Sequence, residues 1–126
     1  VITTPQVAAA EVAERAGRIA HQIHQRVIGV IENMSAIACP KCGDEMDLFG
    51  SGGGEETSRR LTTLVGADVP LMGKVPFNVD LREGGDQGAP VVISAPESDS
   101  AKAITEIVEK LVIRQGSLLG VRLGLA

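Results

Sequence analysis

The sequence predicts a layered α/β domain built around a parallel sheet. Short β-branched segments without polar alternation are typical of strands that are covered on both faces. Between them, apolar residues three or four positions apart are typical of helices packed on one side. The segments follow one another as strand, helix, strand, helix, strand, helix, and this alternation favours parallel strands joined by helical crossovers.

The first element is expected to be the end of a buried strand that leads directly into a helix. We interpret residues 1–4 as the last residues of such a strand, whose earlier part is missing, so we expect the chain to be part of a longer protein. Thr4 as the N-cap and Pro5 at the first helical position mark a helix start, and the helix is expected to end near Gln25. Its predicted buried face consists of Ala8, Val12, Ala16, Ile19 and Ile23.

The middle of the chain predicts two further strands with a helix between them. Residues 26–31 and 69–75 are the strands, and Pro70 stands at the opening of the second, where no ladder hydrogen bond is lost. The helix is expected over about 55–65, and Gly66 ends it.

The last third predicts less regular structure and one more helix. We expect a loop over 76–90, a short extended piece over 91–93, a helix beginning near Ser98 or Asp99, and a loosely held tail over 115–126. The predicted buried residues of this helix are Ala103, Ile104, Ile107, Val108, Leu111 and Val112.

Composition and charge exclude several classes of protein. The net charge of −4, with no basic block and only two aromatic residues, argues against a nucleic-acid partner. No apolar run approaches the roughly 20 residues of a membrane span. Two cysteines at CxxC spacing are too few for a secreted disulfide framework, so a cytoplasmic protein in a reducing compartment is the expectation.

Both cysteines lie in the motif Cys39-Pro-Lys-Cys42-Gly. Proline between the cysteines and glycine after them predict a tight knuckle whose backbone N–H groups point at the sulfurs, as in zinc or iron–sulfur sites. Thiol redox chemistry and inert thiols are the alternatives. The acidic residues Asp44 and Glu45 are expected to raise the thiol pKa, which argues against a redox pair.

A tetrahedral metal site needs four ligands, and the motif supplies two. His21 and His24, three residues apart near the end of the first helix, can complete a zinc set within one chain. Alternatively, a second copy of the chain can bring a second knuckle, and four thiolates then suit zinc or a 4Fe-4S cluster.

Two further features bear on nucleotide binding. The stretch Gly50 to Gly54 precedes a helix, but Glu55 and Glu56 stand where a phosphate loop needs lysine and serine or threonine, so we interpret it as a flexible hinge. Asn33 and the segment 75–77 follow predicted strands, at the edge where open α/β sheets bind ligands. Asn33 is suited to an adenine edge, and Pro76 and Phe77 to the face of a base, although each alone is more often a turn residue.

Taken together, these motifs resemble the Mrp/ApbC iron-sulfur cluster carriers, of the MinD/ParA-like branch of deviant P-loop ATPases. The resemblance covers residues 1–114, with the CPxC loop at 35–54, as the carboxy-terminal portion of the domain. The matching stretches are TTPQ, GVIENMS, CPKCG, LFGSGGGE, PLMGKVPF and LREGGDQGAPVV.

The resemblance implies a fold and a function. The fold is part of a P-loop NTPase-like layered domain. Cys39 and Cys42 would hold a 4Fe-4S cluster between the two subunits of a homodimer, for transfer to apo iron-sulfur proteins. Asn33 and Pro76 would lie near the adenine of ATP. The segment that begins at Phe77 departs from the family's usual sequence, which puts contacts from Asn78 and Asp80 in doubt.

The family's lysine-rich phosphate loop and magnesium-binding motifs are absent from this sequence. We therefore predict no ATP hydrolysis by this chain alone. Two other functions stay open at the level of sequence: a zinc-binding interaction module that uses the histidines, and a thiol oxidoreductase.

Overall fold

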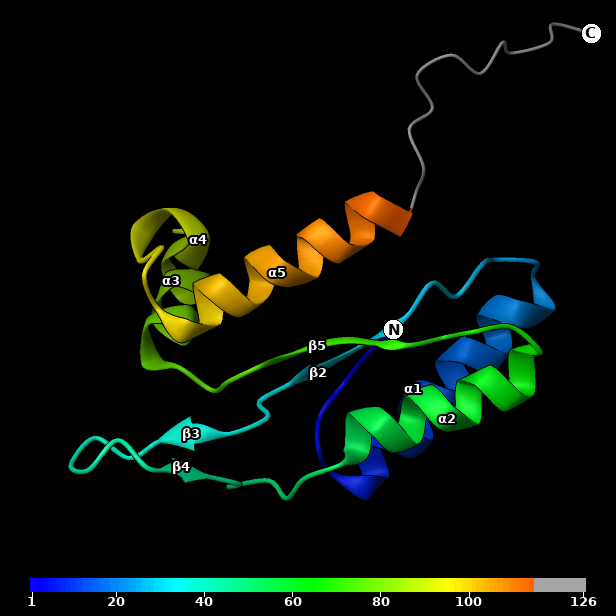
Figure 1. Ribbon diagram of the computed structural model, residues 1–126, viewed down its shortest axis with the longest axis horizontal. Helices are drawn as coiled ribbons and strands as arrows, with labels where there is room; N and C mark the ends of the chain where they lie inside the picture. The colour runs from blue at the N-terminus through cyan, green and yellow to red at the C-terminus, as the bar shows by residue number, and fades with distance from the viewer. Residues whose placement is uncertain (115–126) are drawn as a thin grey trace, which may run out of the picture.

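The computed structural model describes residues 1–114 and shows the predicted α/β architecture (Figure 1). Its main sheet is parallel throughout and has the order β1-β2-β5. The strands are β1 (Ile2–Thr3), β2 (Val30–Asn33) and β5 (Leu71–Val75). The predicted tail over 115–126 lies outside the described residues.

Helices cover both faces of this sheet (Figure 1). One face packs against α1 (Val7–Gln22) and α2 (Gly53–Val65), and the other against α5 (Asp99–Arg114). Two shorter helices, α3 (Val79–Gln87) and α4 (Val91–Ser94), connect β5 to α5. Within the described part of the chain, no helix has the length and apolar character needed to cross a membrane.

The core has one layer on each side of the sheet. The layer under α1 and α2 contains Val27, Val30, Leu61 and Val69. The layer under α5 contains Met72, Val75 and Ile107. Because helices cover both faces of the sheet, β2 and β5 carry apolar residues on both sides, and these made the parallel sheet predictable although Glu32 and Lys74 interrupt the two strands.

A small antiparallel hairpin projects from the main sheet, between β2 and α2 (Figure 1). Its strands are β3 (Ile37–Ala38) and β4 (Glu45–Met46), with Ile37 opposite Met46. We call residues 35–54 the cysteine hairpin, because the turn between the two strands holds both cysteines. The sequence predicted a loop here. In the structure, the antiparallel pairing of β3 with β4 orders that loop as a hairpin.

The predicted start and face of the first helix are wrong. The helix begins at Val7 after Gln6, which makes no side-chain cap, and not after Thr4. Its buried residues are Ala10, Ala13 and Gly17. The larger residues predicted as the buried face are mostly exposed: Val12 is 64%, Ile19 58% and Ile23 62% exposed.

The reason lies in how closely α1 and α2 pack. A Cβ atom on Gly17 would lie 2.3 Å from Leu61 Cδ2, so only a face of small residues fits against α2. The position of the strands also differs in detail, since β2 covers Val30–Asn33 and begins four residues after the predicted strand.

The segment after β5 is more helical than predicted. Asn78 Oδ1 accepts hydrogen bonds from the N–H groups of Asp80 (2.7 Å) and Leu81 (3.3 Å), which starts α3 where a loop was expected. Gly88, at φ +71°, ends it. The predicted extended piece over 91–93 is instead the turn α4, because the N–H groups of Ile93 and Ser94 donate to the carbonyl of Pro90.

The last helix begins at Asp99, as predicted, and buries Ile107. Two residues assigned to its buried side are exposed, with Val108 at 50% and Val112 at 68%.

Candidate functional site

The cysteines lie at the tip of the cysteine hairpin, in a closed turn. Cys39 N–H donates to the carbonyl of Asp44 (2.9 Å), and Gly43 N–H donates back to the carbonyl of Cys39 (2.9 Å). Gly43 has φ +79°, a conformation that a side chain would strain. The knuckle predicted from the proline and glycine is therefore present.

This turn favours a thiolate at Cys39. Backbone N–H groups of Lys41 and Cys42, together with the Cys42 side chain, lower the pKa of the Cys39 thiol. The sequence predicted the opposite direction from the acidic residues nearby. Donors in direct contact with the sulfur outweigh exposed carboxylates, which water screens.

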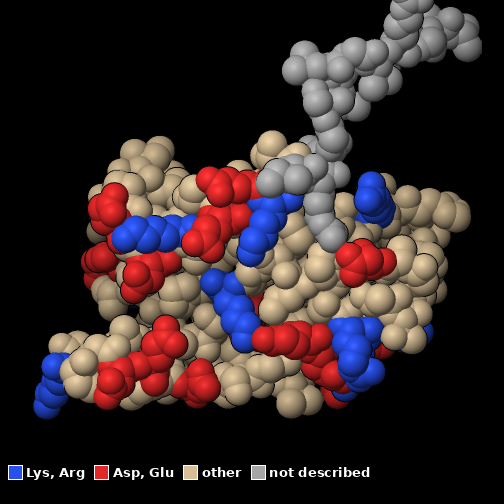
Figure 2. All heavy atoms as spheres, viewed as in Figure 1, with Lys and Arg blue, Asp and Glu red and all other residues tan. Residues whose placement is uncertain are grey.

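Both thiols are free, with Cys39 half-buried and Cys42 exposed. Cys42 Sγ donates to Asp44 Oδ2 at 3.3 Å. Figure 2 shows acidic side chains gathered along the hairpin, which carries Asp44, Glu45 and Asp47. A pair of accessible, closely spaced thiols can bind a soft metal, but it is half of a tetrahedral shell.

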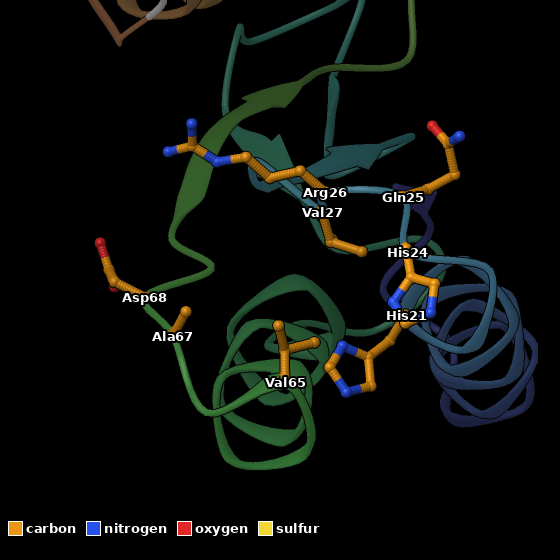
Figure 3. Close-up of a pocket in the computed structure, with 8 residues that line it drawn as sticks. All are labelled: His21, His24, Gln25, Arg26, Val27, Val65, Ala67 and Asp68. Carbon is orange, nitrogen blue, oxygen red and sulfur yellow. The ribbon is translucent and has the colours of Figure 1, made fainter.

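The structure does not bring the two histidines to the cysteines. His21 and His24 lie where α1 ends, whereas the hairpin projects from the opposite end of the molecule (Figure 1). Both histidines line a cavity of about 450 Å³ with Val65 from α2 and Ala67 and Asp68 beyond it (Figure 3).

Among the described residues, no group of three or more His, Cys, Asp or Glu side chains is placed to hold a metal ion. A zinc quartet within one chain therefore has no support in this geometry. The donor set fits a metal or cluster that is shared with another thiol pair.

Two residues predicted to bind nucleotide share one pocket. Asn33 and Phe77 line a pocket of about 280 Å³ at the carboxyl ends of β2 and β5, together with Met34, Asn78, Leu81 and Arg82. Asn33 Oδ1 accepts a hydrogen bond from Met34 N–H (2.9 Å), which leaves the amide nitrogen as the donor that Asn33 can offer to a base. We call this cavity the strand-end pocket.

Pro76, for which a place near the adenine stays a prediction, borders the cysteine hairpin. It lines a separate cavity of about 270 Å³, between the cysteine hairpin and the end of the sheet, beside Glu32 and Lys74. It therefore stands between the two candidate sites, while Phe77 alone of that pair faces the strand-end pocket.

Sequence reasoning missed part of the strand-end pocket. Leu81 and Arg82 enter it from α3, an element that was expected to be a loop. Asn78 was doubtful as a ligand contact, and its amide oxygen instead caps α3. Asparagine after a strand, with Gly88 ten residues later, is the signal from which the helix could have been found.

The glycine stretch is not a free hinge where it enters α2. Gly53 and Gly54 are buried residues of the first helical turn. A Cβ atom on Gly53 would lie 2.5 Å from the carbonyl oxygen of Pro5 and 2.6 Å from that of Thr4. Glycine at these two positions permits close packing of backbone on backbone. This packing accounts for the two glycines without a role in phosphate binding.

The amino end of α2 is already occupied by a carboxylate. Gly54 N–H donates to Glu32 Oε2 at 2.6 Å, and the Glu32 side chain is only 1% exposed. Gly52, the N-cap, has no side chain to satisfy these donors, so Glu32 supplies the acceptor from β2. A phosphate would have to displace it.

Comparison with solved structures identifies the fold. The septum site-determining protein MinD from Pyrococcus horikoshii, complexed with Mg-ADP, superimposes with a TM-score of 0.66 at 22% identity, covering 91% of this chain and 42% of that chain. An ADP-bound nucleotide-binding protein from Archaeoglobus fulgidus gives 0.52 at 32% identity, covering 76% and 36%. The fold is thus that of the MinD-like P-loop ATPases.

Sequence comparison then identifies the family. A family model described as NUBPL iron-transfer P-loop NTPase, of the ParA group, matches residues 1–112, and the chain belongs to this family. The resemblance drawn from the motifs is confirmed.

Curated relatives carry the name iron-sulfur cluster carrier protein. The relative from Mycobacterium leprae is 50% identical over 125 residues, 99% of this chain and 32% of its own length. The relative from Synechocystis is 46% identical over 88% of this chain and 30% of its own length. The relative from Pyrococcus furiosus is 38% identical over 95% of this chain and 38% of its own length. The chain thus spans about a third of these relatives.

Proposed function

We propose that this chain is the cluster-holding part of an iron-sulfur carrier, with Cys39 and Cys42 as ligands of a 4Fe-4S cluster bridged between two copies. The observation that carries the proposal is the paired, accessible thiols on a projecting turn, where the described residues form no group of three or more metal-ligating side chains. A second hairpin brought up about a two-fold axis supplies two more thiolates.

The cluster is cargo, and the hairpin is suited to release it. Cys42 is exposed, and the turn projects away from the main sheet, so an acceptor can approach the sulfurs directly (Figure 1). Ligand exchange with the thiolates of an apo iron-sulfur protein then transfers the cluster. Free thiols of this kind need a reducing compartment, and we propose the cytoplasm.

For nucleotide, we propose that the strand-end pocket receives the adenine of ATP in the full-length protein. Asn33 offers an amide to the base edge and Phe77 an apolar face, and Arg82 borders the same cavity. The phosphate clamp and magnesium ligands are not part of this sequence, so only binding of the base is assigned to these residues.

Anaerobic reconstitution with iron and sulfide tests the cluster. We expect about four iron atoms per two chains, a visible iron–sulfur absorbance, and a dimer by sedimentation. Cys39→Ser and Cys42→Ser should each abolish both the iron and the dimer. His21→Ala is the matched control and should change neither.

Three outcomes would count against this model. Iron bound by strict monomers would exclude a bridging cluster. Loss of metal in His21→Ala would restore the zinc module that uses the histidines. Turnover of small disulfides by the metal-free protein would favour a thiol oxidoreductase. Zinc on four thiolates is separated from iron by metal analysis of the dimer.

A further inference from the structure

The two legs of the cysteine hairpin are fastened to the strand ends that border the strand-end pocket. On the first leg, Ser35 N–H donates to the carbonyl of Val75 (3.1 Å), and the carbonyl of Ala36 accepts from Phe77 N–H (2.7 Å). Phe77 also lines the pocket. Backbone hydrogen bonds thus tie the hairpin to the segment that follows β5.

The second leg is held by a side chain. The buried carboxylate of Glu32 accepts the N–H of Gly54, as described above, and Glu32 immediately precedes Asn33 of the pocket. A Cβ atom on Gly54 would lie 2.8 Å from Glu32 Cβ, so helix and strand are in close contact here. The end of β2 and the start of α2 are therefore joined directly through Glu32 and Gly54.

A lysine from the neighbouring strand compensates the buried charge. Lys74 is paired with Glu32 in the β2–β5 register, and its Nζ lies 3.5 Å from Glu32 Oε1 and 2.7 Å from Glu55 Oε1. The hydrogen bond to Glu55 and the charge of Glu32 raise the pKa of Lys74. The lysine thus stays charged beside the buried side chain that accepts from Gly54.

The junction between pocket and hairpin is also strained. Met34, between Asn33 and Ser35, has φ +57°, a left-handed conformation that is costly for a residue with a long side chain. Its N–H is held by Asn33 Oδ1. A base that accepts from the amide nitrogen of Asn33 orients the side chain whose Oδ1 holds Met34 N–H, and so acts on the residue at which the chain turns from β2 into the hairpin.

We propose that Glu32 is a positioning residue: it transmits occupancy of the strand-end pocket to the cysteine hairpin, so that nucleotide changes the exposure of Cys39 and Cys42. The proposal rests on the proposed function in placing nucleotide in that pocket. It assigns to Glu32 no contact with nucleotide or with the cluster.

Thiol alkylation in the metal-free full-length protein tests the proposal, because it needs no cluster and no turnover. The rates at which iodoacetamide modifies Cys39 and Cys42 are measured with and without Mg-ADP and Mg-ATP, and nucleotide affinity is measured in parallel. In the unmodified protein we expect nucleotide to change the rate at least about threefold, a difference of roughly 0.7 kcal/mol in hairpin exposure.

Glu32→Gln replaces the charged acceptor of Gly54 N–H, which is also the partner of Lys74, by a neutral amide of the same size. It should bind nucleotide within about twofold of the unmodified protein and lose most of the rate change. Glu56→Gln, the same substitution in the first turn of α2 but paired with Arg59 and Arg60, should keep the change in full. If Glu32→Gln does not fold, Glu32→Asp replaces it in the test. Aspartate keeps the charge but is one methylene shorter, so its carboxylate is withdrawn from Gly54 N–H, and the same loss of the rate change is expected.

The proposal is overturned if nucleotide binds without changing alkylation in the unmodified protein, if it does not bind, or if folded Glu32 variants keep the full change. Cluster loading of the same samples separates this failure from that of the proposed function. Protein that loads iron normally but shows no nucleotide effect would refute the role of Glu32 alone. Protein that loads no iron would refute the carrier assignment, whatever the alkylation rates.

Discussion

Replacing Gly53 by alanine tests whether the base of the cysteine hairpin is a packed joint or a hinge. The added Cβ atom would lie 2.5 Å from Pro5 O, 2.6 Å from Thr4 O and 2.7 Å from Pro5 C. Ordinary contact starts near 3.4 Å, so α2 and the end of β1 must separate by about 0.9 Å. The neighbours are backbone atoms, which cannot rotate away.

The expected effect is destabilisation. Overpacking of this kind costs about 1–3 kcal/mol, and the better helix propensity of alanine offsets up to about 1 kcal/mol of it. With the full offset we expect a net loss of up to about 2 kcal/mol in the free energy of unfolding. With a urea m-value of about 2 kcal/mol/M, the midpoint should fall by up to about 1 M.

Gly85→Ala is the matched control. Gly85 lies inside α3 and is exposed, and no atom lies within 4 Å of the place where its Cβ would be. The same substitution should therefore stabilise the protein by about 0.5–1 kcal/mol. If Gly53→Ala raised the urea midpoint as Gly85→Ala does, the joint would not be packed as the structure shows.

Three further predictions concern stability. Leu61→Ala should cost about 2–5 kcal/mol in urea unfolding because Leu61 is fully buried between α2 and the sheet, and a loss below 1 kcal/mol would contradict that placement. Asn78→Ala removes the cap of α3 and should cost about 1 kcal/mol in thermal or urea unfolding, with faster amide hydrogen exchange confined to that helix. Hydrogen bonds from Arg59 and Arg60 lower the pKa of Glu56 to about 2, so its contribution to stability is complete above pH 4.5 and is lost as the pH falls to about 2. Urea midpoints of Glu56→Gln should accordingly lie below those of the unmodified protein at pH 6 and approach them near pH 2, and a constant difference across that range would exclude this ion pair as the cause.

The tight turn of the cysteine hairpin was predictable from sequence, and the anchoring of the hairpin was not. Proline and glycine around Cys39 and Cys42 specify a tight turn through residues within five positions of one another. The direction of the Cys39 pKa shift was wrong because it depends on N–H groups that meet the sulfur only once the turn is folded. The hydrogen bond from Gly54 N–H to Glu32 joins residues 22 positions apart, and no sequence pattern near either residue predicts it.

The lining of the strand-end pocket was likewise predictable only in part. Asn33 and Phe77 follow β-branched strands, and parallel strands bring their carboxyl ends together, so their meeting in one pocket follows from the sheet. Leu81 and Arg82 enter that pocket only because Asn78 starts a helix where two adjacent glycines, Gly84 and Gly85, suggested a loop.

By itself, the sequence determined the α/β order, the thiol pair and its turn, and the family, because each rests on residues close together in the chain or on motifs read in order. Tertiary structure alone decided which face of α1 is buried, where the histidines lie and what holds the hairpin. Those outcomes depend on contacts between residues that are far apart in the sequence. Gly17 of α1 packs against Leu61 of α2 because small residues permit the closest approach of two helices. Glu32 likewise binds Gly54 because the folded sheet leaves the start of α2 in need of an acceptor.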